Sequence, residues 1–131
     1  FIPLIAAMGG NVGVQSAAIV VQGLANKSIK INTILSKLVK ELGVALLNGI
    51  VCSAIIFGAT FVLNYRIDLS LTVSLSLFSV IVFAALFGTF VPLTLDKYKI
   101  DPALATGPFI TTVNDILGLV IYFLIGQSIL V

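Results

Sequence analysis

The chain has 131 residues, of which 60% are hydrophobic and only 9% are charged, with a formal net charge of +2. Soluble domains carry about 25% charged residues, so this composition excludes an ordinary water-facing surface, and the lack of a long basic block argues against a nucleic-acid partner. The sequence has no histidine and one cysteine, which excludes a zinc or copper site of the usual kind.

Four apolar stretches, taken in chain order, predict an all-α fold. A run of about 20 apolar residues can cross the hydrocarbon core of a bilayer as a helix, and no charge occurs in residues 1–26, 42–65 or 69–95. A fourth run, 102–131, holds a single charge. We predict one transmembrane domain over residues 1–131, a polytopic membrane helix bundle whose four spans lie at about 1–24, 42–63, 70–95 and 103–130.

The first span is the least uniform, because glycine, proline and amide side chains interrupt it. Its centre reads MGGNVGVQS over residues 8–16, with three glycines within five residues. Glycine permits the close approach of a helix or a ligand, and Asn11 and Gln15 fall on one helix face. The motif is consistent with tight helix packing and interhelical hydrogen bonds, or with a polar, carbonyl-rich lining of a permeation path.

The basic residues between the spans set the expected orientation. The first and third connectors together hold six lysines, whereas the second holds only Arg66. By the positive-inside rule, the lysine-rich connectors are cytoplasmic and the C-terminus is external. The chain then starts outside without a signal peptide. We therefore expect an integral protein of the cell (plasma) membrane, and a fragment that lacks an upstream helix.

The third span opens with alternating hydroxyl and apolar residues, from Ser70 to Leu77. Alternation usually indicates a strand, but a lone strand cannot satisfy its backbone groups in lipid. We therefore predict a helix in which residues four apart, Ser70 with Ser74 and Thr72 with Ser76, form faces that meet other helices.

The fourth span carries Asp115, the only charged residue among the last 30. A carboxylate at that depth costs about 2.5–3.5 kcal/mol on insertion scales, and is tolerable only facing the bundle interior, a partner or water. Thr111 and Thr112 lie one turn before it, and Gly118 about one turn after. Oxygen ligands of this kind suit Mg²⁺ or Ca²⁺. The alternative is an aspartate that only bonds to hydroxyls of a neighbouring helix.

Residues before the carboxylate add expected features of the same span. Asp101 is expected to cap a helix that has Pro102 at its first position. Pro108 cannot donate to the carbonyl of Leu104, which leaves that oxygen free. We expect the ion path to be lined by small, hydroxyl and amide residues and by exposed carbonyls, at positions Gly9, Gly10, Asn11, Gly13, Gln15, Leu104, Gly107, Thr111, Thr112 and Asn114.

Three separated runs, in register over essentially the whole chain, resemble the transmembrane domain of the MgtE magnesium-transporter family. They are MGGNVGVQS (8–16), KELGVALLNG (40–49) and IDPALATGPFITTVNDILGLVIYF (100–123). The resemblance implies a five-helix domain that forms a homodimer with a pore near the dimer axis, to which this chain supplies helices two to five. It also implies a regulatory cytosolic domain or partner that is not in this chain.

The resemblance extends to individual positions. Asp115 matches the acidic residue of the fifth helix that binds Mg²⁺ in the family, and the glycine-rich motif matches the segment that lines the same path. Mg²⁺ would be both transported ion and ligand, with Mn²⁺ or Co²⁺ as further possibilities. Val14 and Gly107 stand where some members carry asparagine, which implies a thinner polar lining.

Together these features predict a transport protein rather than an enzyme. We expect it to move a divalent cation, Mg²⁺, across the membrane through a dimeric pore in which Asp115 binds the hydrated ion. Its partners would be membrane lipid and a second copy, with no nucleic acid. Two alternatives stay open: a proton- or sodium-coupled exporter of a cation or solute that uses Asp115 as proton acceptor, and a structural membrane subunit.

Overall fold

The computed structural model describes residues 1–26 and 31–131. Four long helices, α1 (Ile2–Ala25), α2 (Ile31–Val62), α3 (Ile67–Lys97) and α4 (Pro108–Leu130), account for most of them, with one short 3-10 helix, η1 (Pro102–Ala105). The described residues contain no strand, and all four long helices have the length and composition needed to cross a membrane. The all-α membrane bundle predicted from the sequence is confirmed.

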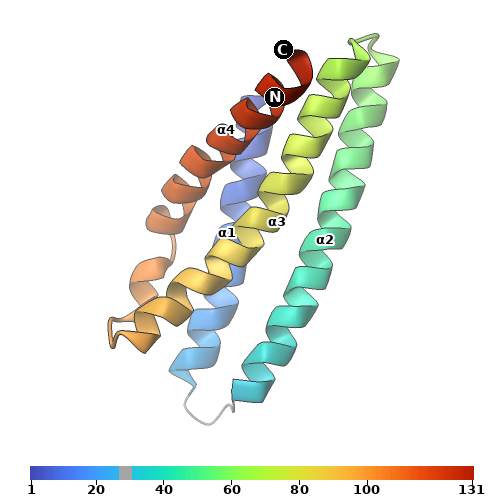
Figure 1. The fold of residues 1–131 in the computed structure, drawn as a ribbon. Helices are drawn as coiled ribbons and strands as arrows, with labels where there is room; N and C mark the ends of the chain where they lie inside the picture. Colours follow the sequence, from blue (N-terminus) through green and yellow to red (C-terminus); the bar gives the residue numbers. More distant parts are fainter. Residues whose placement is uncertain (27–30) are drawn as a thin grey trace.

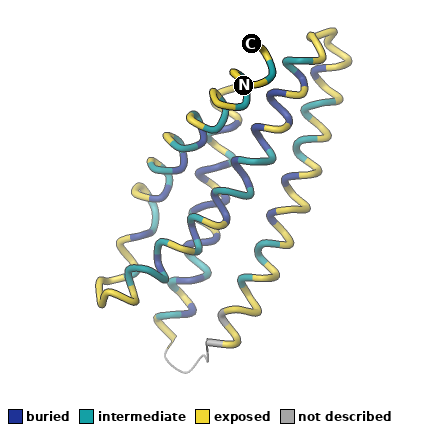
Figure 2. The backbone as a smooth tube through the Cα atoms, in the orientation of Figure 1, coloured by how far each residue is buried: buried dark blue, intermediate teal, exposed yellow. Residues whose placement is uncertain are grey.

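The helix α3 is the centre of the bundle. It packs against α1, α2 and α4, whereas α2 has no contact with α4 among the described residues (Figure 1). Half of the most apolar stretch of α3 is buried, compared with 11% for α2 and 17% for α4. As a consequence, the outward faces of α2 and α4 are largely exposed along their length, as Figure 2 shows. Large hydrophobic side chains such as Leu47, Ile55 and Phe123 are exposed there, as is typical of lipid-facing helix surfaces.

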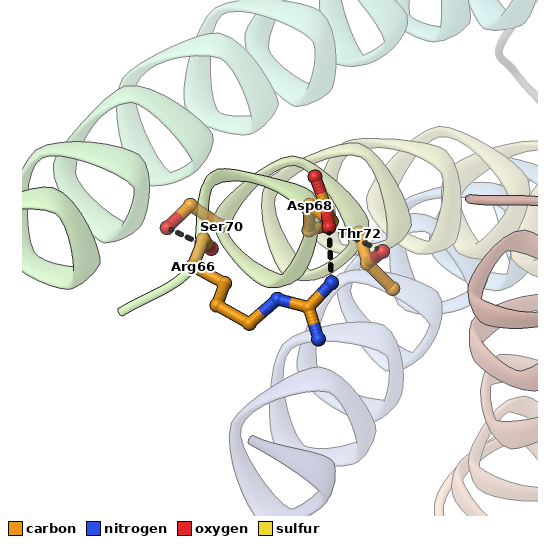
Figure 3. A network of polar contacts seen from close by, with 4 residues as sticks. All are labelled: Arg66, Asp68, Ser70 and Thr72. Atoms are coloured by element: carbon orange, nitrogen blue, oxygen red, sulfur yellow. Dashed lines mark hydrogen bonds and ion pairs between the residues drawn. The ribbon is translucent and has the colours of Figure 1, made fainter. Parts of the chain in front are cut away.

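The two ends of the bundle hold different connectors. The N- and C-termini lie at the same end as the α2–α3 connector, and the η1 segment lies at the opposite end with the start of α2 (Figure 1). At the end near the termini, the Arg66 guanidinium donates to Asp68 at 2.7 Å, and both side chains are substantially exposed. Figure 3 shows this pair at the start of α3, beside Ser70 and Thr72.

The hydroxyl residues that open α3 are helical and turned toward other helices, as predicted. Ser70, Thr72, Ser74 and Ser76 are all buried. Thr72 Oγ1 donates to the carbonyl oxygen of Asp68 at 2.7 Å, and Ser74 Oγ to that of Ser70 at 2.7 Å. These bonds within the helix satisfy the hydroxyls of Thr72 and Ser74, whereas Ser76 Oγ has no partner among the described residues. Bonding of hydroxyls to their own helix backbone explains how a strand-like pattern is compatible with a membrane helix.

The structure places two helix boundaries differently from the sequence-based ranges. The helix α2 begins at Ile31 and so extends upstream of the membrane span expected at 42–63. The exposed side chains of Lys37 and Lys40 lie in this extension. The fourth span is divided. Asp101 caps η1 by accepting from the Ala103 N–H at 3.0 Å, as expected, but α4 begins only at Pro108.

Gly107 separates η1 from α4. Its φ of +57° lies in the region that favours glycine, and it directly precedes Pro108 in the first turn of α4. The carbonyl of Leu104 therefore lies in η1 instead of inside a continuous helix. Gly107 thus has a conformational role at a position where the sequence suggested only a thinner polar lining.

Candidate cation site

A groove whose lining includes amide and hydroxyl side chains runs between α1 and α4. Its volume is about 670 Å³, and it is open to one side of the bundle. Residues from both helices line it: Asn11, Val14, Gln15, Ala18, Gly107, Pro108, Thr111 and Thr112. Five of these belong to the lining set expected from the sequence. Asn11, Gln15 and Thr112 are exposed in the single chain, so amide and hydroxyl groups of both helices face outward at this groove.

Asp115 lies one turn along α4 from Thr111 and Thr112. Its side chain is half-buried, and its Oδ1 approaches the backbone of α1: a methyl group on Gly10 would lie 3.4 Å from this oxygen and 3.2 Å from Cγ2 of Thr111. With no side chain at Gly10, Thr111 and Asp115 pack directly against the α1 backbone.

No hydrogen bond or ion pair reaches the Asp115 carboxylate within the part of the chain that the structure describes. The nearby hydroxyl of Thr111 is engaged elsewhere, since its Oγ1 donates to the carbonyl oxygen of Gly107 at 3.1 Å. The alternative role, an aspartate held by hydroxyls of neighbouring helices, has no support among these contacts. A half-buried carboxylate without a protein partner is suited to a cation.

Gly9 and Gly13 lie inside the bundle, away from the groove. A methyl group on Gly9 would lie 2.8 Å from Cγ1 of Val80 in α3, and a methyl group on Gly13 would overlap the side-chain amide of Asn114. Both glycines are buried. Their contacts show tight packing of α1 against α3 and α4, which was one of the two roles expected for this motif.

Asn114 and Leu104, also in the expected lining set, lie in contrasting environments. Asn114 is 1% exposed and faces the interior at Gly13. Leu104 is 64% exposed and lies on η1, at the end of the bundle beyond the start of α4. Neither residue lines the groove itself. The groove is also lined by three residues outside the set expected from the sequence: Val14, Ala18 and Pro108. The only signal for them in the sequence is the i, i+4 spacing of Val14 and Ala18.

The carboxylates of one chain do not gather into a metal cluster. No group of three or more histidine, cysteine, aspartate or glutamate side chains comes together among the described residues. At Asp115 the remaining candidate ligands are neutral oxygens of amides, hydroxyls and the backbone. Such a site is compatible with an oxygen-loving cation that keeps much of its water shell.

These features define the class of protein: a polytopic helical membrane domain with a half-buried carboxylate one turn from a groove that amide and hydroxyl side chains help to line. A family model for MgtE, described as a divalent cation transporter, matches residues 2–125. The chain belongs to the MgtE family, whose members are transporters rather than enzymes.

Curated relatives agree with this assignment. The chain is 38% identical over 128 residues to a magnesium transporter MgtE of Bacillus subtilis, which covers 98% of this chain. It is 32% identical over 130 residues to a protein of the same name from Thermus thermophilus, and 35% identical over 127 residues to one from Enterococcus faecalis. The chain spans only 28–29% of the length of these relatives.

Proposed function

We propose that this domain carries a divalent cation, Mg²⁺, across the membrane, and that Asp115 binds the hydrated ion on its path. The observation that carries the proposal is that the Asp115 carboxylate is half-buried and has no protein partner among the described residues. It lies in an apolar helix bundle, one turn from the hydroxyl residues Thr111 and Thr112 that line the groove. A charge at that depth is costly unless a cation or water compensates it.

The polar face of α1 and α4 supports a pore formed by two copies of the chain. Asn11, Gln15 and Thr112 are exposed on helices that span the membrane, and in a lone chain they would face lipid without hydrogen-bond partners. A second copy related by a twofold axis would cover this face and enclose the groove. It would also bring two Asp115 carboxylates to one path, and their combined charge would match a divalent cation.

The oxygens near Asp115 suit an ion that is still hydrated. Mg²⁺ gives up water reluctantly and is often bound through only one or two carboxylates. Asp115 would hold the ion's water shell, while the carbonyls near Gly10 and Thr111 would accept hydrogen bonds from the same waters. Inward movement would be driven by the membrane potential, which contributes about 2.3 kcal/mol per charge per 100 mV and about twice that for a divalent ion.

Mg²⁺ uptake into liposomes that contain the protein tests this proposal. Asp115→Asn keeps the size of the side chain and removes its charge, so uptake should fall at least about tenfold, on the scale of losing a charged ligand. Asp68→Asn is the matched control, because Asp68 lies in the exposed pair at the end of α3. Normal uptake by Asp115→Asn would refute the assignment. Dependence on a pH or sodium gradient rather than on voltage would favour a coupled exporter.

A further inference from the structure

Asn114, the residue that precedes Asp115, is buried without a hydrogen-bond partner. It is 1% exposed, and neither its Oδ1 nor its Nδ2 has a partner among the described residues. Buried amides are nearly always hydrogen-bonded, and leaving one unpaired is destabilising. No hydrogen bond among the described residues therefore holds this side chain in place, and its position is set by the shape of what surrounds it.

The surface that holds Asn114 is the backbone of α1 at Gly13. A methyl group on Gly13 would overlap the Asn114 amide and would lie 3.0 Å from Cγ2 of Ile110. Gly13 is supported in turn by α3, since a methyl group on Gly88 would overlap the Gly13 carbonyl oxygen. The α1 backbone is thus packed between α3 and α4 and has no room to move away from Asn114.

The position of Asn114 bears directly on that of Asp115. Successive residues point about 100° apart around a helix, so the rotation that places Asn114 inside the bundle turns Asp115 toward the groove side of α4. On α1, the partner of Asp115 is Gly10, one turn from Gly13. Because a side chain extends beyond the Cα radius of the helix, a small rotation of α4 moves the carboxylate farther than the backbone.

We propose that Asn114 is a positioning residue for the cation site. Its packing against Gly13 sets the rotation of α4 and so sets where the Asp115 carboxylate meets the ion. The inference rests on the proposed function, because it assigns to Asn114 the placement of the proposed ligand. It predicts that crowding or emptying the contact between Asn114 and Gly13 changes the affinity for the ion.

A double-mutant cycle in liposomes tests this. Gly13→Ala adds a methyl group that displaces the Asn114 amide, and we expect the half-saturating Mg²⁺ concentration to rise at least about fivefold, as misplacement of a ligand predicts. Asn114→Ala empties the contact and should raise the half-saturating Mg²⁺ concentration at least about threefold. The double variant fills the vacated space with the new methyl group, so half-saturation should return to within about twofold of the original protein.

The control is Gly49→Ala, which crowds another helix contact, since its methyl group would lie 3.0 Å from Cδ2 of Phe78. It should leave half-saturation unchanged, even where thermal unfolding shifts. Asp115→Asn is measured in parallel.

The inference is overturned if both single variants keep the original half-saturation while Asp115→Asn abolishes uptake, in which case the proposed function still stands. It is also overturned if both singles weaken the affinity and the double variant shows no recovery. If Gly13→Ala does not fold, Asn114→Ala decides alone, and an unchanged half-saturation refutes the inference. Normal uptake by Asp115→Asn refutes the proposed function instead.

Discussion

The Asp115 carboxylate and the Gly10 backbone face each other across the contact between α1 and α4, with Oδ1 placed 3.4 Å from where a Gly10 methyl group would be. Because Gly10 has no side chain, only its backbone lies opposite the carboxylate at this contact. A charged side chain of α4 therefore lies against a position of α1 that carries no side chain.

The first prediction concerns this contact. Gly10→Ala should raise the half-saturating Mg²⁺ concentration for liposome uptake about threefold or more, because the methyl group crowds Thr111 at 3.2 Å and comes into contact with the Asp115 carboxylate at 3.4 Å. Gly126→Ala serves as control, since its methyl group would meet only Cγ2 of Thr72, at an ordinary 3.6 Å. Equal half-saturation for the two variants would show that the space at Gly10 is irrelevant to the ion.

The second prediction concerns the packing of α1 on α3. Gly88→Ala should lower the free energy of unfolding by about 1–3 kcal/mol, because a methyl group there overlaps the carbonyl oxygen of Gly13 and only a backbone shift relieves it. Unfolding in detergent, followed by circular dichroism, measures the change. Gly58→Ala, with no neighbouring atom within 4 Å, should be neutral or stabilising. A neutral Gly88→Ala would contradict the close approach of these helices.

The third prediction concerns the break before α4. Gly107→Ala should destabilise the protein by about 1–2 kcal/mol, because a φ of +57° is strained for any residue with a Cβ. No atom lies within 4 Å of the added methyl group, so the effect isolates the backbone conformation. Gly43→Ala, at an equally open position with ordinary φ, is the comparison in the same unfolding assay. Equal stability of the two variants would contradict the positive φ at Gly107.

The fourth prediction concerns the exposed ion pair at the start of α3. Asp68→Ala should change the free energy of unfolding by less than about 1 kcal/mol, because the side chains of Arg66 and Asp68 are 82% and 46% exposed and their attraction is screened by water and salt. Unfolding measured at low and high salt should show the small difference shrinking as salt rises. A larger loss that is independent of salt would mean that Asp68 has a structural role.

Much of the fold follows from local patterns in the sequence. The charge-free runs predict four membrane helices, and the buried hydroxyls of α3 are helical as expected, because lipid leaves no alternative for their backbone groups. The Asp101 cap also follows from its dipeptide with Pro102. The start of α4 does not follow from the sequence. The pattern around Pro108 allows either one continuous helix with a free carbonyl at Leu104 or a second helix that begins at Pro108.

The candidate site was only partly accessible from the sequence. Asp115 is conspicuous as a lone charge in an apolar run, and Asn11, Gln15, Thr111 and Thr112 share its polar character and lie at the groove. Gly88 gave no such signal, because a single glycine in a membrane helix is common and its partner, Gly13, is distant in the chain.

The sequence by itself determined that this is a four-helix membrane domain with one charged residue at depth, because hydropathy and charge are properties of each segment alone. Only the tertiary structure decided that the neighbours Asn114 and Asp115 have opposite surroundings, one sealed against Gly13 and the other turned toward Gly10. Both residues are polar, and their order in the chain does not say which face of α4 is buried. The rotation of α4 depends on where the bare backbones of α1 and α3 allow another helix to approach.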